Sequence, residues 1–371
     1  MNVLELLRKL VSFKTVNPPG NECECAQFIG NFLESLGFQT RFYEFAPERT
    51  SLVAQFQGIS QDPEICFTGH LDVVSPGETP WAGPAFSAEI KDGKIFGRGT
   101  SDMKAGIAAM LAAAHRISKT SPALLEKILF VFTAGEETCC EGAYHLAGTD
   151  SALKKVKALV VGEPTSNYPL TGHKGCLRFD ITTFGKAAHA SMPELGDNAV
   201  YKAARAVQQL ENLDFGIPPH PLLGSPTICI GRISGGKNIN MVPDRTCIGV
   251  DIRIIPGQSH ISVKQALEAV LDPKIEITLL EQAKSIVTDP ENKWIQSVFS
   301  IMEKMLQKKI VAKAASYFTD ASALHDALGN PPTVLLGPGE ASMAHKTDEF
   351  CYISKISQAV DAYTAIIEQT I

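Results

Sequence analysis

Five short clusters of histidine and acidic residues carry the side chains that could do chemistry in this chain. Each cluster follows an apolar run, and each is too common on its own to identify a site. Together they supply two histidines and several carboxylates, the ligand set for two divalent ions that share one bridging carboxylate. Such a two-metal centre indicates hydrolysis. The clusters are TGHLDV with His70 and Asp72, GRGTSDMKAG with Asp102, TAGEET with Glu136 and Glu137, VVGEPTS with Glu163, and MAHKTDE with His345.

His70 and Asp72 are two residues apart in a segment that reads as extended. Residues i and i+2 of a strand point to the same side. Asp72 can therefore accept a hydrogen bond from the far ring nitrogen of His70, which fixes the tautomer and raises the basicity of a ligand. A His-x-Asp pair is also frequent by chance, so it gains meaning only together with the other clusters.

Asp102 follows the segment GRGTS and precedes an alanine-rich helix. The glycines Gly97 and Gly99 permit the sharp chain path that a bridging ligand needs. A carboxylate at the start of a helix is equally an ordinary N-terminal acid that interacts with the helix dipole. Both interpretations remain open from these residues alone.

Glu136 and Glu137 stand next to each other after an apolar strand-like run. This position places two like charges in a cleft rather than on a solvated helix. One of them can bind a metal while the other stays free as a general base near an attacking water. Glu163 lies at another strand end, before Pro164. His345 lies in a loop, where an unligated histidine is the more common case.

The elements that must position these residues alternate between strand and helix patterns. Alternation of this kind predicts an α/β domain with a mixed, mostly parallel sheet and helices on both faces. In such sheets functional groups gather at the carboxyl ends of the strands, where His70, Glu136, Glu137 and Glu163 stand. The expected strands are 52–56, 65–68, 128–132 and 158–161, and the expected helices are 3–13, 26–36 and 103–116.

The middle of the chain shows a different order of elements. Strand 177–184, helix 198–212, strands 227–233 and 246–255, helix 263–271 and strand 275–280 are expected there. This βαββαβ order is the ferredoxin-like split motif. The earlier alternation then resumes with helix 294–306, strand 333–336 and helix 353–367. We therefore expect a discontinuous catalytic domain, residues 1–174 and 286–371, with an inserted domain of residues 175–285.

The composition is that of an ordinary globular enzyme, with 44% hydrophobic and 20% charged residues. A net charge of −6 argues against a nucleic-acid partner, which favours a basic face. Apolar runs fall short of the roughly 18 residues of a membrane span, and the N-terminus does not read as a signal peptide. The nine cysteines form no framework, which favours a reducing, cytoplasmic location.

The motifs TGHLDVV, GRGTSDMKAG, AGEE and GEPT, followed by LGPG and His345, give the chain a wider resemblance. From residue 1 to about residue 370 it resembles the co-catalytic zinc metallohydrolase family that contains acetylornithine deacetylase, succinyl-diaminopimelate desuccinylase, aminoacylase and carboxypeptidase G. The resemblance implies a zinc exopeptidase-like fold and two Zn²⁺ per subunit, with Co²⁺ or Mn²⁺ as substitutes.

The resemblance also implies a role for each matched residue. His70 and Glu163 would bind one metal, and Glu137 and His345 the second. Asp102 would bridge both and be followed by a cis peptide. Glu136 would be the general base, and Asp72 would orient His70.

The same family uses its inserted domain as a lid and dimerisation domain, which implies a homodimer. In the motif GKAAHAS, His189 would reach the substrate carbonyl, from its own subunit or the partner. Asn240 in GGKNINMVPD, Arg253 in DIRIIPG and Lys174 in GHKG would bind the substrate. Without the resemblance, His189 is equally a core or surface histidine, and Arg253 an exposed strand residue.

The expected function is hydrolysis of the amide bond of a small N-acyl amino acid, as in acetylornithine deacetylase. The segments GHKGCLR (172–178) and YFTDASAL (317–324) depart from the desuccinylase pattern and weaken that reading. Desuccinylation, aminoacylase activity, and carboxypeptidase, dipeptidase or tripeptidase activity on short peptides remain as alternatives. An unrelated aminopeptidase fold is disfavoured by the insertion. A non-catalytic homologue is disfavoured because every motif position holds the expected residue type.

Overall fold

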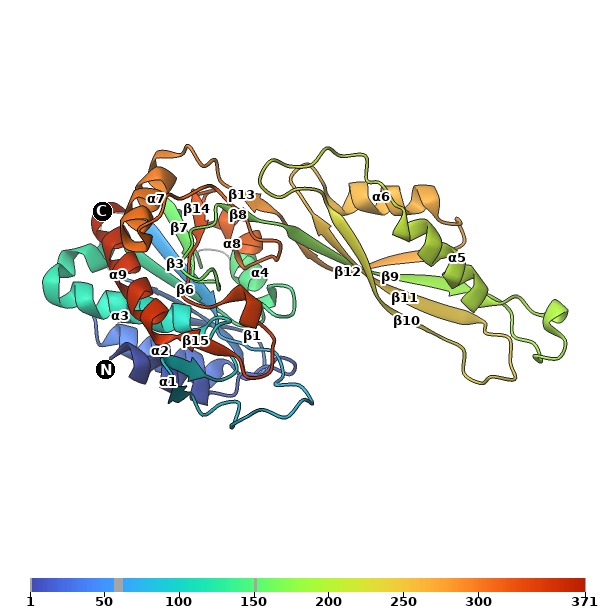
Figure 1. The fold of residues 1–371 in the computed structure, drawn as a ribbon, viewed down its shortest axis with the longest axis horizontal. Helices are drawn as coiled ribbons and strands as arrows, with labels where there is room; N and C mark the ends of the chain where they lie inside the picture. Colours follow the sequence, from blue (N-terminus) through green and yellow to red (C-terminus); the bar gives the residue numbers. More distant parts are fainter. Residues whose placement is uncertain (1, 57–62, 150–151, 371) are drawn as a thin grey trace. The chain divides into compact units, whose positions relative to one another are not determined.

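The structure is a computed structural model that describes residues 2–56, 63–149 and 152–370. The chain divides into two compact units (Figure 1). Each unit has a hydrophobic core of its own. The first unit comprises Met1–Gly172, Val287–Ala314 and Thr319–Ile371, and the inserted unit comprises His173–Ile286 and Ala315–Phe318.

The inserted unit also contains Ala315–Phe318, which we expected in the catalytic domain. The reason is local pairing. His173 and Ala315 form a parallel bridge, and the Lys174 amide donates a hydrogen bond of 3.1 Å to the Ala315 carbonyl. His173 and Lys174 therefore also belong to the inserted unit rather than to the outer one.

The first unit is built on a six-stranded sheet with the order β1-β2-β6-β3-β7-β14. The strands β6, β3, β7 and β14 run parallel to one another, whereas β2 runs antiparallel to β6 and β1 antiparallel to β2. This confirms the expected mixed, mostly parallel sheet. The strands are β1 (Gln39–Ala46), β2 (Arg49–Gln55), β3 (Ile65–His70), β6 (Ile128–Thr133), β7 (Ala158–Val161) and β14 (Thr333–Leu335).

Helices cover both faces of this sheet. Phe67, Phe130 and Val160 point to one face and share a core with five helices, α1 (Val3–Ser12), α2 (Cys23–Glu34), α3 (Lys104–Thr120), α7 (Lys293–Leu306) and α9 (Ile353–Thr370). Alternate residues such as Cys66 and Val131 are also buried and point to the opposite face. There α4 (Glu141–Gly148) packs against β2 and against α8 (Ala321–Ala327).

A buried lysine joins the first helix to the segment that carries Asp102. The Lys104 Nζ donates hydrogen bonds to the carbonyls of Leu10 and Phe13, at 3.0 and 2.8 Å, and to the Thr15 hydroxyl at 2.9 Å. Its three donors are thus satisfied at the C-terminal end of α1. The start of α3, directly after Asp102, is fixed by this contact.

A small antiparallel sheet brings the last part of the chain beside the Asp102 segment. It contains β4 (Glu89–Lys91), β5 (Lys94–Phe96) and β15 (Phe350–Tyr352), in the order β15-β5-β4. Because β15 pairs with β5, the loop with His345 lies near the loop that leads to Asp102. A two-stranded pair, β8 (Gly172–His173) and β13 (Ile286–Val287), forms where the chain enters and leaves the inserted unit.

The inserted unit has an antiparallel sheet with the order β10-β11-β9-β12. Its elements follow the chain as β9 (Gly175–Phe184), α5 (Ala199–Glu211), β10 (Thr227–Gly235), β11 (Arg245–Ile254), α6 (His260–Val270) and β12 (Glu276–Ala283). This is the predicted ferredoxin-like βαββαβ motif. Apolar residues of β9 and β11 share a core with α5 and α6, and the other face of the sheet carries ion pairs such as Arg178–Asp251.

Candidate metal centre

Three neighbouring strands place acidic and histidine side chains at one edge of the main sheet. His70 is the last residue of β3, Glu136 follows the end of β6 by three residues, and Glu163 follows the end of β7 by two. Because β3 lies between β6 and β7 and all three run parallel, their carboxyl ends meet at this edge. The location is the one that the sequence predicts.

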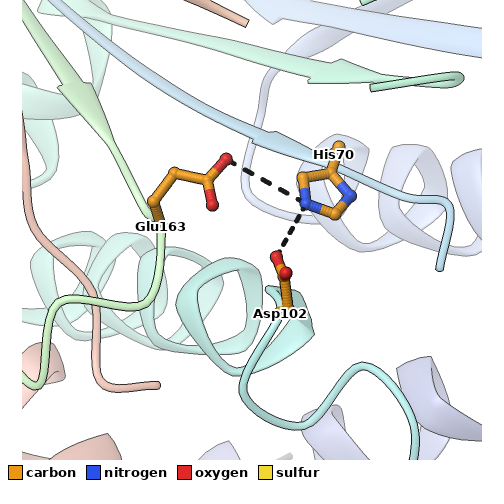
Figure 2. A group of neighbouring side chains, drawn as sticks. All are labelled: His70, Asp102 and Glu163. Atoms are coloured by element: carbon orange, nitrogen blue, oxygen red, sulfur yellow. Dashed lines mark hydrogen bonds and ion pairs between the residues drawn. The ribbon is translucent and has the colours of Figure 1, made fainter. Parts of the chain in front are cut away.

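A first group consists of His70, Asp102 and Glu163 (Figure 2). The His70 Nε2 lies 3.1 Å from Asp102 Oδ1 and 4.0 Å from Glu163 Oε1. Two ligand atoms at ~2.1 Å from a tetrahedral Zn²⁺ lie about 3.4 Å apart. The three side chains therefore have the spacing needed to surround one ion.

A second group consists of Asp102, Glu137 and His345. The His345 Nε2 lies 3.4 Å from Asp102 Oδ2 and 3.0 Å from Glu137 Oε2. Asp102 thus faces His70 with one carboxylate oxygen and His345 with the other. This arrangement would suit a carboxylate that bridges two ions. The Asp102–Met103 peptide bond is cis, as the resemblance implies.

Asp72 contacts His70 in a different way from the one the sequence suggests. The His70 Nδ1 lies 3.0 Å from the Asp72 backbone carbonyl and 3.5 Å from its carboxylate. The Asp72 carboxylate accepts hydrogen bonds from the amides of Glu136 and Glu137, both at 3.1 Å, and from Asn17 Nδ2 at 2.9 Å. Asp72 therefore fixes the loop of the two glutamates as well as the ring of His70.

The carboxyl groups of this centre are strongly affected by burial. Burial raises the pKa of Glu136 and of Glu163 well above the ordinary value, and neighbouring carboxylates add to the increase. The pKa of Glu137 is raised by the same cause. Carboxylates that are crowded and buried in this way need protons or cations to balance their charge. A set of nitrogen and oxygen donors with excess negative charge fits divalent metal ions.

The two histidines respond to the same carboxylates. Hydrogen bonds to Asp102 and Glu137 raise the pKa of His345 to about 10. Burial alone would lower the pKa of His70, but Asp102 and Asp72 raise it well above the ordinary value. Each imidazole thus faces anionic oxygens at the place where a cation would lie.

In the inserted unit, His189 has a defined tautomer. The Ser191 amide donates a 3.1 Å hydrogen bond to His189 Nδ1, so the ring proton of the neutral imidazole is on Nε2. The Ala190 amide bonds to the Asn240 carbonyl at 3.0 Å, and His189 forms a bridge with Met241. His189 and Asn240 therefore belong to one local group.

Arg253 and Lys174 form a separate group. Arg253 Nε and Nη2 lie 2.7 and 3.2 Å from the two oxygens of Asp251, and the guanidinium lies over the Phe318 ring. Lys174 Nζ donates to the Ser225 carbonyl at 2.6 Å, and burial together with the charge of Arg253 lowers the pKa of Lys174. Asn240 precedes β11 and Arg253 lies near its end, so the two groups are separated by roughly 25 Å or more of strand.

Sequence reasoning missed two residues that support the centre. Asn17 bonds to Asp72 and, at 3.0 Å, to the Thr138 hydroxyl. Glu349 is fully buried against the loop of Asp102. The only sequence signal for Asn17 is its position before two prolines. The only signal for Glu349 is its position in the cluster that contains His345. Among the described residues, no helix is long and apolar enough to cross a membrane.

Comparisons with known proteins place this geometry in a family. The model of peptidase family M20/M25/M40 matches residues 66–369. A probable succinyl-diaminopimelate desuccinylase of Staphylococcus epidermidis is 31% identical over 99% of this chain and 98% of that protein.

Solved structures share the fold. An M20 family metallo-carboxypeptidase of Sulfolobus solfataricus superimposes with a TM-score of 0.85 at 18% identity, over 100% of this chain and 99% of that one. A dinuclear metal-binding peptidase of Bacillus subtilis gives a TM-score of 0.70 at 16% identity, over 100% and 98%. These findings confirm the resemblance drawn from the motifs and, with it, a metal-dependent amidohydrolase. The chain belongs to peptidase family M20/M25/M40.

Proposed function

We propose that this protein hydrolyses the amide bond of a small N-acyl amino acid with the help of two divalent ions. The observation that carries the proposal is the position of Asp102, whose two carboxylate oxygens face His70 and His345 separately. Two ions bound there would polarise the scissile carbonyl and acidify the attacking water.

The proposed ligands divide into two sets that share Asp102. His70, Asp102 and Glu163 hold one ion, and Asp102, Glu137 and His345 hold the other. Zn²⁺ is the proposed metal because imidazole and carboxylate donors at these spacings suit a tetrahedral ion. Co²⁺ and Mn²⁺ accept the same donors and are the proposed substitutes.

Glu136 is the proposed general base. It is buried beside the two ligand sets, and burial raises its pKa well above the ordinary value of a glutamate, which strengthens it as a base. Glu136 takes a proton from the attacking water and delivers it to the leaving amine. Asp72 keeps Glu136 and Glu137 in place through their backbone amides.

His189 is the proposed oxyanion donor. Its Nε2–H is not engaged by the bond to Ser191, which uses Nδ1, and a fixed N–H donor stabilises the negative oxygen that develops at the carbonyl. Asn240 in the same group would hold polar parts of the substrate. Lys174 and Arg253 would attract its carboxylate.

The separation of these two groups supports a homodimer. A small N-acyl amino acid cannot span the roughly 25 Å of strand between Asn240 and Arg253. We therefore propose that one subunit supplies Lys174 and Arg253 and the partner supplies His189 and Asn240. The nine cysteines, scattered along the chain without a disulfide framework, support a reducing, cytoplasmic location.

Desuccinylation is the second candidate substrate reaction. It is favoured by the relative named a probable succinyl-diaminopimelate desuccinylase, which is 31% identical over nearly the full length of both chains. A substrate panel separates the candidates. It contains N-acetylornithine, other N-acetyl amino acids, N-succinyl-diaminopimelate and short peptides that end in glutamate.

The variant Glu136→Gln tests the mechanism. It should retain both ions and lose activity by about 10²–10⁴-fold, the usual contribution of a general base. Metal content is measured by elemental analysis, and turnover is measured on the best substrate of the panel. Glu141→Gln, an exposed glutamate at the start of α4, is the matched control and should keep its activity. Near-normal turnover in Glu136→Gln would exclude the proposed role.

A further inference from the structure

The carboxylate of Glu349 lies fully buried beneath the loop that leads to Asp102. Its Oε1 accepts hydrogen bonds from the amides of Ser101, at 2.7 Å, and Asp102, at 3.0 Å. Its Oε2 accepts one from the Gly99 amide at 3.0 Å and one from Arg98 Nη1 at 2.7 Å. Four donors therefore converge on one side chain.

These donors explain how the loop keeps its path. Successive amides that point at one anion form a concave nest, and Glu349 fills it from within the protein. A buried carboxylate is costly unless it is paired and hydrogen-bonded, and here Arg98 provides the opposite charge. The side chain thus fixes the backbone at Asp102 itself, because it accepts from the Asp102 amide.

The same contact also ties the Asp102 loop to the segment of His345. Glu349 follows His345 by four residues, and its carbonyl accepts from the Gly97 amide at 2.8 Å. Arg98 Nη1 donates to the Lys346 carbonyl at 3.2 Å. The Ser101 hydroxyl donates to the Phe350 carbonyl at 2.7 Å. The loop of residues 97–102 and the segment of residues 345–350 are therefore held at a fixed separation.

The two ligand sets depend on this contact to different degrees. His70 and Glu163 follow β3 and β7, which are paired directly in the main sheet, so their separation is set by strand register. His345 instead follows the end of β14 by ten residues, on a loop where its φ is left-handed at 62°. The hydrogen bonds around Glu349 tie this loop to the Asp102 segment, together with the Glu340 amide, which donates to the Ser101 hydroxyl at 3.0 Å.

We propose that Glu349 is a positioning residue that sets the separation of Asp102 and His345, and so controls binding of the second ion. The inference rests on the proposed metal ligands. Loss of Glu349 should weaken the Asp102–Glu137–His345 position more than the His70–Asp102–Glu163 position, because the latter keeps two ligands that strand register places. Changes to residues that orient ligands typically cost 10–100-fold in metal affinity.

The test is Glu349→Gln, which keeps the size of the side chain. The new amide removes the charge opposite Arg98 and cannot accept from all four donors. Metal-stripped wild type and variant are titrated with Zn²⁺ in competition with a chromophoric chelator, which gives two dissociation constants for the wild type. We expect the weaker second constant to rise at least 10-fold and the first to change by less than about 3-fold.

Glu340→Gln is the matched control, because it makes the same change a few residues before the segment of residues 345–350. The Glu340 carboxylate accepts from the Ser166 hydroxyl rather than from the amides of the Asp102 loop, and both constants should match those of the wild type. Circular dichroism of the metal-free proteins checks folding. If Glu349→Gln does not fold, Arg98→Lys weakens one of the four bonds, and it should shift the second constant in the same direction by a smaller factor.

The outcomes separate the two proposals. A wild type that binds fewer than two ions overturns the proposed ligand sets and this inference with them. A wild type with two ions, and a variant whose constants both stay within about 3-fold, overturns the role of Glu349 alone. Equal weakening of both constants also overturns it, because the effect would then not be specific to His345.

Discussion

At the scale of the residue, Glu22 combines deep burial with an ionisable group. Its carboxylate is fully buried against Arg49, whose Nε lies 3.0 and 3.2 Å from the two oxygens. Burial, and secondly the charge of Asp72, raises the pKa of Glu22 to about 7, although Arg49 acts to lower it. Removing this pair from water costs more than its attraction returns.

This raised pKa predicts how stability depends on pH. Between the unfolded value of 4.5 and about 7, the folded chain holds the proton of Glu22 more tightly than the unfolded chain does. The contribution of Glu22 to stability should therefore fall as the pH rises through that window. Glu22→Gln removes this dependence. The free energy of unfolding of the wild type minus that of the variant should fall by about 2–3 kcal/mol from pH 5 to pH 8.

Urea unfolding at both pH values measures this difference. The exposed Glu24→Gln on the same helix serves as control and should show a difference that does not change with pH. A constant difference for Glu22→Gln as well would show that Glu22 stays ionised throughout.

The proposed ligands of the centre, and their proximity in the fold, could be predicted from the sequence because their side-chain type carries the chemistry. His70, Glu163 and His345 are recognisable as imidazole and carboxylate donors near strand ends or motif loops. The support that Asp72 gives to the loop of Glu136 and that Glu349 gives to the loop of Asp102 was not visible, because the partners are backbone amides, which every non-proline residue has. Only the folded chain shows which amides converge on one oxygen.

At the scale of the element, α3 approaches β7 more closely than a side chain permits. A Cβ on Gly106 would lie 2.2 Å from the carbonyl oxygen of Gly162, the residue before Glu163. The Gly162 carbonyl is a backbone group and cannot rotate away as a side chain can. Either α3 or the segment after β7 would therefore have to move. Gly106→Ala should destabilise the protein by about 1–3 kcal/mol and weaken the ion held by Glu163.

Thermal unfolding and the Zn²⁺ titration described above measure both effects. Gly148→Ala in α4 is the matched control, since its Cβ would meet no atom within 4 Å. By helix propensity alone it should be neutral or stabilise by up to about 1 kcal/mol. A Gly106→Ala protein as stable as Gly148→Ala would contradict the close approach.

Elements with an apolar pattern were predicted, and those without one were missed. Strand 158–161 matches β7 in both bounds, because all four of its residues are apolar and buried. The edge strand β1 was not predicted, since its residues alternate between exposed and half-buried without a clean apolar face. The short helices α4 and α8 extend over too few turns to show a helical period.

At the scale of the whole molecule, the two hydrophobic cores have no residue in common among those that the structure describes. All the proposed metal ligands lie in the first unit. Bound ions should therefore stabilise that unit alone, by about 2.7 kcal/mol when free metal exceeds the dissociation constant 100-fold. Calorimetry should show two transitions, and a chelator should lower only one of them, by about 5–10 °C for a unit of this size.

A Glu137→Gln, His345→Ala double variant provides the control, because its response to chelator should be smaller. Equal shifts of both transitions, or one transition that moves as a whole, would contradict independent cores.

The discontinuous order of the units was visible in the sequence as an interruption of the strand and helix alternation. The sequence did not show that Ala315–Phe318 belong to the inserted unit. Their place there depends on local contacts, such as the bridge and the amide bond to Ala315, rather than on an apolar pattern. This affects which fragments of the chain can be expressed alone. Residues 173–286 expressed alone would lack Ala315, the partner of Lys174, and Phe318, the ring beneath Arg253. A single proteolytic cleavage between the units would not separate them, because the polypeptide crosses from one unit to the other four times.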